Sequence, residues 1–227
     1  MLQLKSLNVE ENTKFWETPP SNDYKADVVA RVILQICSSY VGRVALDVGA
    51  ANGSLMGVFT MLFPDRAITG IDVAPKSPKV LKASSTDMPF GDQSFDTVFW
   101  TDVIEHYNNS DLDRTLSEIN RVLTPGGRLI ASTINKENLE QSVVTCPHCF
   151  ARFHMMGHCQ VFSDERIRIE FPKKGFEPIK LVETNLGALA KYGWIARLAY
   201  KIGLDRIVKS KPWHIDLIIV AQKIPNQ

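Results

Sequence analysis

The sequence predicts a doubly wound α/β fold with a mostly parallel sheet of seven strands. Three observations carry this prediction. Apolar runs of strand length alternate with segments whose apolar residues have helical spacing. The run at 44–48 passes into a helical segment through small residues, as a strand does where it leads into a helix. At 227 residues, the chain is long enough for one such domain with a sizeable core.

The expected elements can be placed along the chain from these patterns. The expected strands are apolar runs at 43–48, up to Asp72, 80–84, 95–100, 128–132, 179–184 and 213–222. The expected helices have helical spacing or a capping residue and lie at 25–38, 54–63, 110–123 and 163–174. Ser110 and Ser163 are the expected N-caps of the last two helices. Within 186–210 we expect one or two amphipathic helices packed on the domain, the alternative being a cap over a substrate or a membrane surface.

The segment 44–55 indicates a ligand. Its apolar run contains Asp47 and is followed by a turn with Gly49 and Gly53. A turn of small residues lets a ligand approach the backbone, and the helix N-terminus presents free N–H groups to it. About 25 residues further on, a second apolar run ends at Asp72, where nucleotide-binding α/β folds hold a ribose. The sequence therefore predicts a cofactor that contains adenosine.

The carboxylate of Asp47 narrows the choice of cofactor. A dinucleotide would place its pyrophosphate in this turn, where a carboxylate repels it. S-adenosylmethionine carries an ammonium group and no phosphate, so it suits the carboxylate. The segment resembles the first motif of class I S-adenosylmethionine-dependent methyltransferases, an acid followed by x-Gly-x-Gly-x-Gly, with Ala51 in place of the middle glycine. Taken alone, this motif also fits a plain strand–turn–helix in another doubly wound protein.

The resemblance to this family extends over roughly residues 15–133 in order and spacing. The segments 85–90, 94–100, 101–106 and 123–130 are similar to successive blocks of the family. The resemblance implies a Rossmann-like sheet, with Asp87 facing the adenine amino group of the cofactor and Met88 packed on the adenine ring. The residues that we expect to bind the cofactor are Asp47, Gly49, Ala51, Gly53, Asp72, Val73, Asp87, Met88 and Thr101.

One departure from the family concerns the segment after Asp72. Family members place a helix there that covers one side of the adenine pocket. Pro75 and Pro78 leave too few residues for a helix before the third strand. We therefore expect other apolar residues to cover the pocket; the candidates are Phe15, Trp16, Met88 and Phe90.

The segment 146–159 has the spacing of a zinc site, since it holds three of the four cysteines and three of the five histidines. In a Cys-x2-Cys pair both sulfurs can face one ion, and His154 can supply a third ligand. Spacing alone leaves the fourth ligand open between His158 and Cys159, and Cys159 would give the spacing of a zinc knuckle. A subset of class I methyltransferases is similar in this segment and implies His158. The expected ligands are Cys146, Cys149, His154 and His158.

Four protein ligands would leave no open position on the metal, so the predicted zinc ion is structural. The alternative is a metal-free loop with reduced cysteines. With this insertion, the single domain 1–227 divides into four parts. These are a lead-in and first helix at 1–40, a cofactor-binding core at 41–133, an insertion after strand five that is expected to bind zinc at 134–162, and the C-terminal helices and last two strands at 163–227.

Two residues after the fourth strand are candidates for catalysis. The sulfonium methyl of the cofactor is already activated, so the protein must align the acceptor and, for a hydroxyl, remove a proton. His106 lies where the methyl would point, and its imidazole suits a general base. The alternative is that Glu105 and His106 only shape the pocket. Asp102 is expected near the methionine portion of the cofactor or the edge of the substrate.

Composition narrows the class of substrate. The net charge is +1 and no basic stripe with interleaved aromatics is present, so we expect no strong nucleic-acid binding. No apolar run reaches the roughly 18 residues that a spanning helix needs. The start of the chain lacks the pattern of a signal peptide and the cysteines suit a reducing compartment, so a cytoplasmic location is expected. Oligomeric state cannot be inferred.

The sequence therefore predicts an S-adenosylmethionine-dependent methyltransferase that acts on an oxygen or nitrogen nucleophile of a small molecule. One alternative is an RNA or protein methyltransferase that uses the zinc loop to recognise its substrate. Another is a non-catalytic module that binds S-adenosylmethionine.

Overall fold

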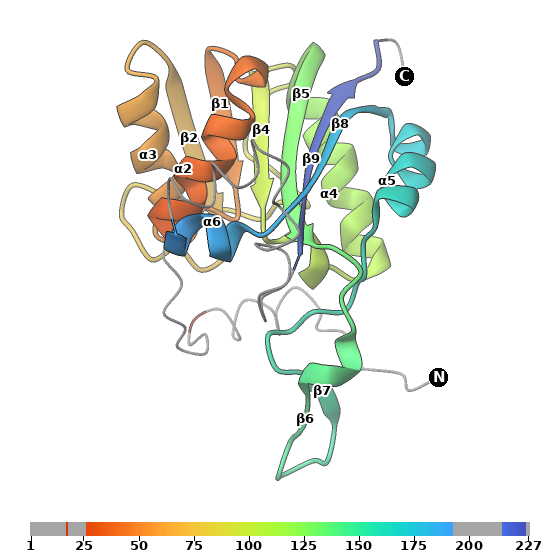
Figure 1. Ribbon diagram of the computed structural model, residues 1–227. Helices are drawn as coiled ribbons and strands as arrows, with labels where there is room; N and C mark the ends of the chain where they lie inside the picture. The colour runs from red at the N-terminus through yellow and green to blue at the C-terminus, as the bar shows by residue number, and fades with distance from the viewer. Residues whose placement is uncertain (1–16, 18–25, 193–214, 226–227) are drawn as a thin grey trace.

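A seven-stranded sheet covered by helices on both faces forms the body of the molecule (Figure 1). The computed structural model describes residues 17, 26–192 and 215–225. The strand order is β3-β2-β1-β4-β5-β9-β8. The first five strands are parallel, while β9 pairs antiparallel with both β5 and β8. The predicted doubly wound and mostly parallel sheet is confirmed.

All seven expected strands and the four expected helices are present, although β5 and β8 begin earlier than expected and β3 is shorter. The sheet contains β1 Val44–Val48, β2 Ala67–Asp72, β3 Leu81–Lys82, β4 Phe95–Thr101, β5 Leu123–Ile134, β8 Phe176–Thr184 and β9 Asp216–Lys223. The α-helices are α2 Ala26–Ile36, α3 Ser54–Leu62, α4 Asn109–Val122, α5 Asp164–Glu170 and α6 Leu186–Tyr192. Short 3-10 turns lie at η1 Ser38–Tyr40, η2 Ile104–His106, η3 Leu139–Ser142 and η4 Pro172–Lys174.

Two helix boundaries differ from the prediction. Helix α4 is capped by Asn108, whose side chain accepts a hydrogen bond from the Asp111 N–H at 2.9 Å, and not by Ser110. Asparagine is as good an N-cap as serine, and Asn108 has the extended backbone that a cap requires. Helix α5 has the predicted cap, Ser163, but it ends at Glu170, because the chain continues into the 3-10 turn that begins at Pro172.

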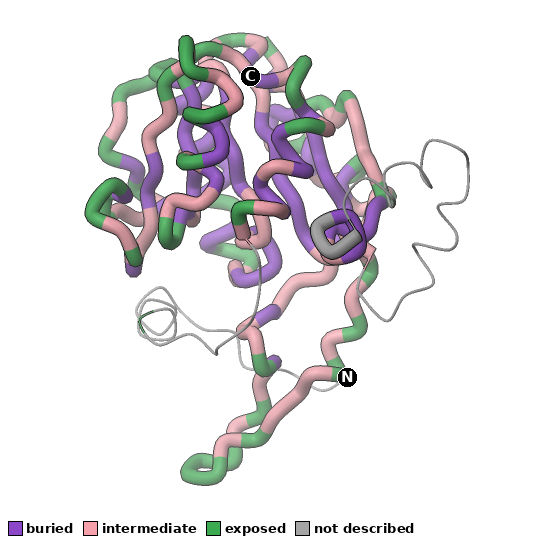
Figure 2. The backbone as a smooth tube through the Cα atoms, turned by 60° about the vertical axis from the view of Figure 1, so that its left-hand side comes forward, coloured by how far each residue is buried: buried purple, intermediate pink, exposed green. Residues whose placement is uncertain are grey.

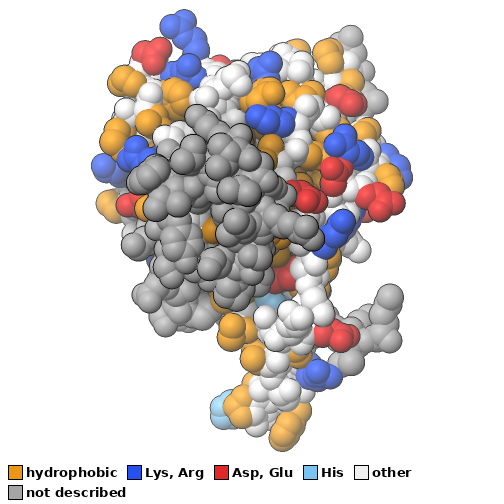
Figure 3. Space-filling model, in the orientation of Figure 1, with side chains coloured by type: hydrophobic (Ala, Val, Ile, Leu, Met, Phe, Trp, Pro, Cys, Tyr) orange, Lys and Arg blue, Asp and Glu red, His pale blue; other side chains and the backbone are white. Residues whose placement is uncertain are grey.

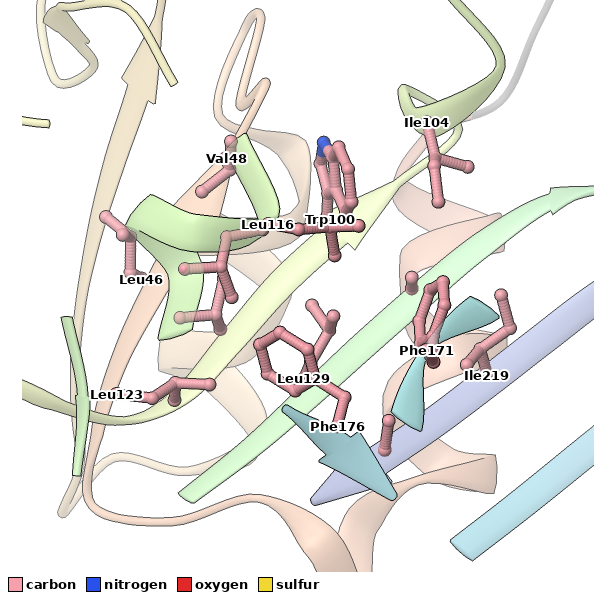
Figure 4. Packing of buried hydrophobic residues seen from close by; sticks show 14 of the residues in the cluster. Leu46, Val48, Trp100, Ile104, Leu116, Leu123, Leu129, Phe171, Phe176 and Ile219 are labelled. Carbon is pink, nitrogen blue, oxygen red and sulfur yellow. The ribbon is translucent and has the colours of Figure 1, made fainter. Parts of the chain in front are cut away.

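Alternating side chains along the strands build two cores. On one face, α4 and α5 pack over residues that include Trp100, Leu129 and Ile219; Figure 4 shows part of this cluster. On the other face, α2, α3 and α6 pack over residues that include Phe99 and Ile130. Neighbouring residues of one strand enter opposite cores, so burial on both faces fixes the register of the strands. The register in turn fixes the edge of the sheet at which the parallel strands end.

The insertion after β5 forms a hairpin of β6 Val143–Thr145 and β7 Arg152–His154. The hairpin projects from the edge of the sheet at which β1, β4 and β5 end (Figure 1). Most of it is exposed or half-buried, with buried positions near the body (Figure 2). It therefore extends the molecule beside the edge where α/β sheets bind their ligands.

No helix lies between β2 and β3 in this fully described part of the chain, as the two prolines predicted. Of the expected helices in 186–210, α6 is present and residues 193–210 lie outside the described residues, as do Phe15 and Trp16. No helix among the described residues is long and apolar enough to cross a membrane.

Candidate active site

A cavity of about 800 Å³ lies at the carboxyl ends of the parallel strands. Its volume suits a small-molecule site. The turn after β1, the end of β2, the segment after β4 and the base of the hairpin all contribute to its lining. The predicted site residues in that lining are Asp47, Gly49, Ala51, Asp72, Val73, Thr101, Asp102, His106, His154 and His158.

The turn after β1 has an unusual backbone. Gly49 and Gly53 have φ values of 80°, and Ala51 has a φ of 46°. A Cβ atom on Gly49 would lie 2.5 Å from Cγ2 of Val103, so glycine is required there for space as well as for conformation. Ala51 adopts the left-handed conformation that the middle glycine of the motif would take without strain.

Strain at Ala51 leads to a prediction. The left-handed conformation costs alanine about 1–2 kcal/mol, and glycine avoids this cost. Glycine also makes the unfolded chain more flexible, which lowers the free energy of unfolding by about 0.4–1 kcal/mol. We expect Ala51→Gly to raise the free energy of unfolding by about 0.5 kcal/mol in a denaturant titration. The same change at Ala30, inside α2, is the control and should lower that free energy by about 1 kcal/mol or more. A clear loss of stability in Ala51→Gly would contradict the assigned strain.

Asp72 holds the turn from the neighbouring strand. Its Oδ2 accepts a hydrogen bond from the Ala51 N–H at 2.9 Å, and its Oδ1 accepts one from the Ala74 N–H at 2.8 Å. The carbonyl oxygen of Ala51 accepts a further bond from the Lys76 N–H at 2.9 Å. The segment after β2, which has no helix, is thereby tied to the turn.

Asp47 is a buried carboxyl group on the wall of the cavity. Its side chain is 2% exposed, and its Oδ2 has no hydrogen-bond partner among the described residues. Burial, with the nearby charge of Asp72, raises its pKa to about 7. A bound cation beside Asp47 would stabilise its carboxylate against both burial and the repulsion from Asp72.

Further acids approach the cavity from the ends of β4 and β9. Asp102 has a φ of 55°, and its Oδ1 accepts a hydrogen bond from the Ser132 hydroxyl at 2.6 Å. Asp216 accepts a bond from the Leu186 N–H at 2.7 Å, and burial with the charge of Asp102 raises its pKa to about 7. Burial likewise raises the pKa of Glu105 well above its usual value.

The cavity therefore favours positive ligands. The described carboxylic side chains in its lining are Asp47, Asp72, Asp102, Glu105, Asp111, Glu137 and Asp216. Against these, Lys76 is the one lysine or arginine that the described part of the lining contains. A sulfonium and an ammonium group would both be attracted to such a surface.

Three histidines meet at the base of the hairpin. His106 is buried, and burial followed by the proximity of His158 lowers its pKa to about 3, so its imidazole is neutral. Its ring meets that of His158 edge-on at 4.7 Å between centroids, and His158 stacks on His154 at 4.5 Å. Glu137 reaches both hairpin histidines, with its Oε2 2.7 Å from His158 Nδ1 and its Oε1 3.5 Å from His154 Nε2. Figure 3 shows histidine and acidic side chains together where the hairpin joins the body.

Comparison with known proteins now identifies the family. Residues 46–131 match a family model described as a methyltransferase domain. O-methyltransferase rstn1 of Aspergillus nomiae is 30% identical over 191 residues, which cover 74% of this chain and 81% of the relative. The chain belongs to the class I S-adenosylmethionine-dependent methyltransferases.

Other relatives in this family differ in length. Malonyl-[acyl-carrier protein] O-methyltransferase of Methylococcus capsulatus is 25% identical over 189 residues, which cover 75% of this chain and 65% of the relative. The chain spans between 35% and 65% of the length of the first relatives that it matches. The fold is shared with 1,6-didemethyltoxoflavin-N1-methyltransferase of Burkholderia thailandensis, at a TM-score of 0.60 and 16% identity, covering 89% of this chain and 80% of that one. That structure contains S-adenosylhomocysteine.

Three residues that the family motifs pointed to lie outside the described cavity lining. Gly53 begins α3 from within the turn. Met88 is buried in the core under α4, and its N–H donates to Glu118 at 2.7 Å. Asp87 is exposed, whereas Ser84, Ser85 and Thr86, just before it, line the cavity. Contacts of Asp87 and Met88 with adenine stay predictions for this methyltransferase family member.

The four predicted zinc ligands do not share one cluster among the described residues. In the described part of the chain, two groups of three side chains have ligand atoms within 4.8 Å of one another: Glu137 with His154 and His158, and Glu105 with His106 and His158. Neither group contains a cysteine. Cys146 and Cys149 lie at the turn of the hairpin, between β6 and β7. Cys159 donates from Sγ to the Tyr107 carbonyl oxygen at 3.0 Å, and burial raises its pKa to about 11. The thiol of Cys159 is therefore neutral.

Sequence reasoning missed Glu137 and Asp216. Glu137 follows the end of β5, and Asp216 is the first residue of β9. An acid beside a strand end is a weak signal on its own. Only the pairing of β9 with β5 brings Asp216 to the edge at which the parallel strands end.

Proposed function

We propose that the protein transfers the methyl group of S-adenosylmethionine to an oxygen or nitrogen atom of a small molecule. The observation that carries this proposal is the acidic cavity beside the left-handed turn of Gly49, Ala51 and Gly53. It joins a backbone surface for close approach of a cofactor with carboxylates that suit the positive groups of that cofactor. Membership of the family supports the same reaction.

The cofactor would lie along the ends of β1 and β2. Asp72 would accept hydrogen bonds from the ribose hydroxyls through the lone pairs that its two backbone donors leave free. Asp47 would face the ammonium group of the methionine portion, since it is buried and its Oδ2 lacks a partner among the described residues. When bound, the cofactor supplies an activated methyl group on a sulfonium.

The acceptor would occupy the part of the cavity between β4, β9 and the hairpin. Asp102 and Asp216 border this part, so a neutral or positive acceptor fits better than an anionic one. His106 would accept a hydrogen bond from an acceptor hydroxyl as the proton leaves, although its low pKa makes it a weaker base than an exposed imidazole. Asp102, held by Ser132, would orient the acceptor by a hydrogen bond.

A polymer substrate is less well supported. The insertion at 134–162 has two basic residues, Lys136 and Arg152, against two acidic ones, Glu137 and Glu140. Such a segment offers little to a phosphate backbone. A submicromolar and steeply salt-dependent affinity for RNA would favour the polymer alternative. Binding of S-adenosylmethionine without methyl transfer to any acceptor in a cell extract would favour the non-catalytic module.

The proposed function does not include a zinc site with four protein ligands. Its cysteines lie at the hairpin turn and share no described ligand cluster with His154 and His158. A cytoplasmic location is proposed with the function, supported by free thiols at Cys37, Cys146, Cys149 and Cys159.

The proposal is tested by calorimetry with S-adenosylmethionine and by mass spectrometry of extracts incubated with the protein and a cofactor whose methyl group is isotopically labelled. We expect binding of one cofactor per chain and a labelled product of low molecular mass. An absence of cofactor binding by the unmodified protein would refute the function.

The role of His106 gives a separate prediction. His106→Asn should lower kcat for a hydroxyl acceptor by roughly ten- to hundredfold, at the low end of general-base catalysis because the pKa of His106 is low, while the Kd for the cofactor stays within a few-fold. His148→Asn is the control, since His148 is exposed on the hairpin. A kcat for His106→Asn within a few-fold of the unmodified protein would assign the residue to pocket shape alone.

A further inference from the structure

We infer that Glu137, His154 and His158 bind one divalent transition-metal ion in the wall of the cavity, without Cys146 or Cys149. Two imidazoles with one carboxylate form a ligand set for such ions, and the open positions that they leave distinguish this site from a closed structural zinc site. The sequence spacing pointed to the same two histidines, but with Cys146 and Cys149 in place of Glu137.

Geometry supports this ligand set. One ligand atom from each residue lies within 4.8 Å of the other two. Around an ion with bonds of about 2.0–2.1 Å, neighbouring ligand atoms are roughly 2.9–3.4 Å apart. The carboxylate oxygens of Glu137 lie 2.7 Å from His158 Nδ1 and 3.5 Å from His154 Nε2. Glu137 would therefore need to shift by only a few tenths of an ångström, whereas the nitrogens of the two histidines, which lie within 4.8 Å of each other, would have to approach by up to about 1.5 Å.

The three ligand side chains are enclosed by the protein. The side chains of His154, His158 and Glu137 are 2%, 8% and 7% exposed. The two rings stack with an interplanar angle of 19°. Because the lone pair of a ring nitrogen lies in the ring plane, one ring must turn out of this stack for both histidines to bind one ion. Ligation through His154 Nε2 requires its ring proton on Nδ1, so the 3.3 Å contact that the His158 N–H makes with Nδ1 must open on binding.

The open positions of the ion would face the cavity, because all three ligands line it. An oxygen of the acceptor would have access to them, and a bound ion would lower the pKa of an acceptor hydroxyl there. The assignment of these positions to the acceptor rests on the proposed function, whereas the metal site itself does not.

The experiment measures metal binding by the full chain in the absence of S-adenosylmethionine. The protein is freed of metal, loaded with Co²⁺, and examined by elemental analysis and optical spectroscopy. We expect one ion per chain, with visible ligand-field bands and without the thiolate-to-cobalt absorption in the near ultraviolet that cysteine ligands produce. Added acetohydroxamate should change the visible bands, since it can bind only to a metal with open positions.

Variants separate the two ligand sets. Glu137→Gln should weaken Co²⁺ at least roughly tenfold, while Glu140→Gln, the same change at an exposed position of the insertion, should have no effect. A variant with both Cys146→Ser and Cys149→Ser should keep the ion. Loss of the ion in that variant, a thiolate absorption band, or no stoichiometric metal in the unmodified protein would each overturn the inference.

The spectrum of the unmodified protein decides the matter even where Glu137→Gln fails to fold. Cofactor calorimetry on the same samples keeps the two hypotheses apart. A protein that binds Co²⁺ but not S-adenosylmethionine refutes only the proposed function, and the reverse result refutes only the metal site.

Discussion

Asp47→Asn is expected to stabilise the cofactor-free protein at pH 8 and to weaken its binding of S-adenosylmethionine. The pKa of Asp47 is raised from 3.8 to about 7 in the folded protein, chiefly by burial. Between these values the unfolded chain binds fewer protons than the folded one, so the free energy of unfolding falls as the pH rises. Asparagine has no charge to bury, so it should recover on the order of 1–3 kcal/mol at pH 8 and little at pH 4.

Cofactor binding should change in the opposite direction. An ammonium group beside Asp47 favours the carboxylate, so the unmodified protein should release a proton on binding below pH 7 and bind more tightly as the pH rises. At pH 8, loss of a charged hydrogen bond of about 1.5–3 kcal/mol weakens binding roughly ten- to hundredfold.

Both effects can be measured on one pair of proteins. Urea titrations at pH 4 and pH 8 give the stability difference, and calorimetry in buffers of different ionisation enthalpy counts the released protons. Equal stability changes at both pH values, or an unchanged proton count in Asp47→Asn, would contradict the assigned role of this carboxyl group.

The fold and the left-handed turn after β1 could be predicted because their signals are local. The turn from Asp47 to Gly53 places its chemistry within a few residues, and the structure gives all three turn positions the backbone of glycine. The absence of a helix in the segment with Pro75 and Pro78 could also be predicted, since proline restricts its own backbone. The first residue of α4 was harder to predict, because Asn108 and Ser110 are both good N-caps.

The far wall of the cavity could not be predicted in this way. Asp216 reaches it through the pairing of β9 with β5, and Glu137 through the return of the hairpin onto the end of β5. The dense spacing of Cys146 and Cys149 drew attention to thiolates, while the acid that contacts the histidines lies outside the segment 146–159. Spacing along the chain identifies ligands on one turn but not those that separate elements bring together.

Asp72→Ala is expected to weaken S-adenosylmethionine binding by more than the loss of one ligand contact. The carboxylate would lose its bonds to the ribose, at about 1.5–3 kcal/mol, or roughly ten- to hundredfold in Kd. It would also release the N–H groups of Ala51 and Ala74, so the turn at the cofactor would be held less firmly. We therefore expect a loss in affinity of at least roughly a hundredfold, together with a lower melting temperature.

Asp96→Ala separates the ligand contact from the structural one. Asp96 likewise accepts backbone bonds, from the N–H groups of Arg43 at 2.8 Å and Val44 at 3.1 Å, but it is not part of the described cavity lining. We expect Asp96→Ala to lower the melting temperature and to leave the Kd for the cofactor within a few-fold. Calorimetry and thermal melts of both variants provide the comparison. If Asp72→Ala lost stability but kept its affinity, as Asp96→Ala should, then Asp72 would be a support of the turn and not a ligand of the ribose.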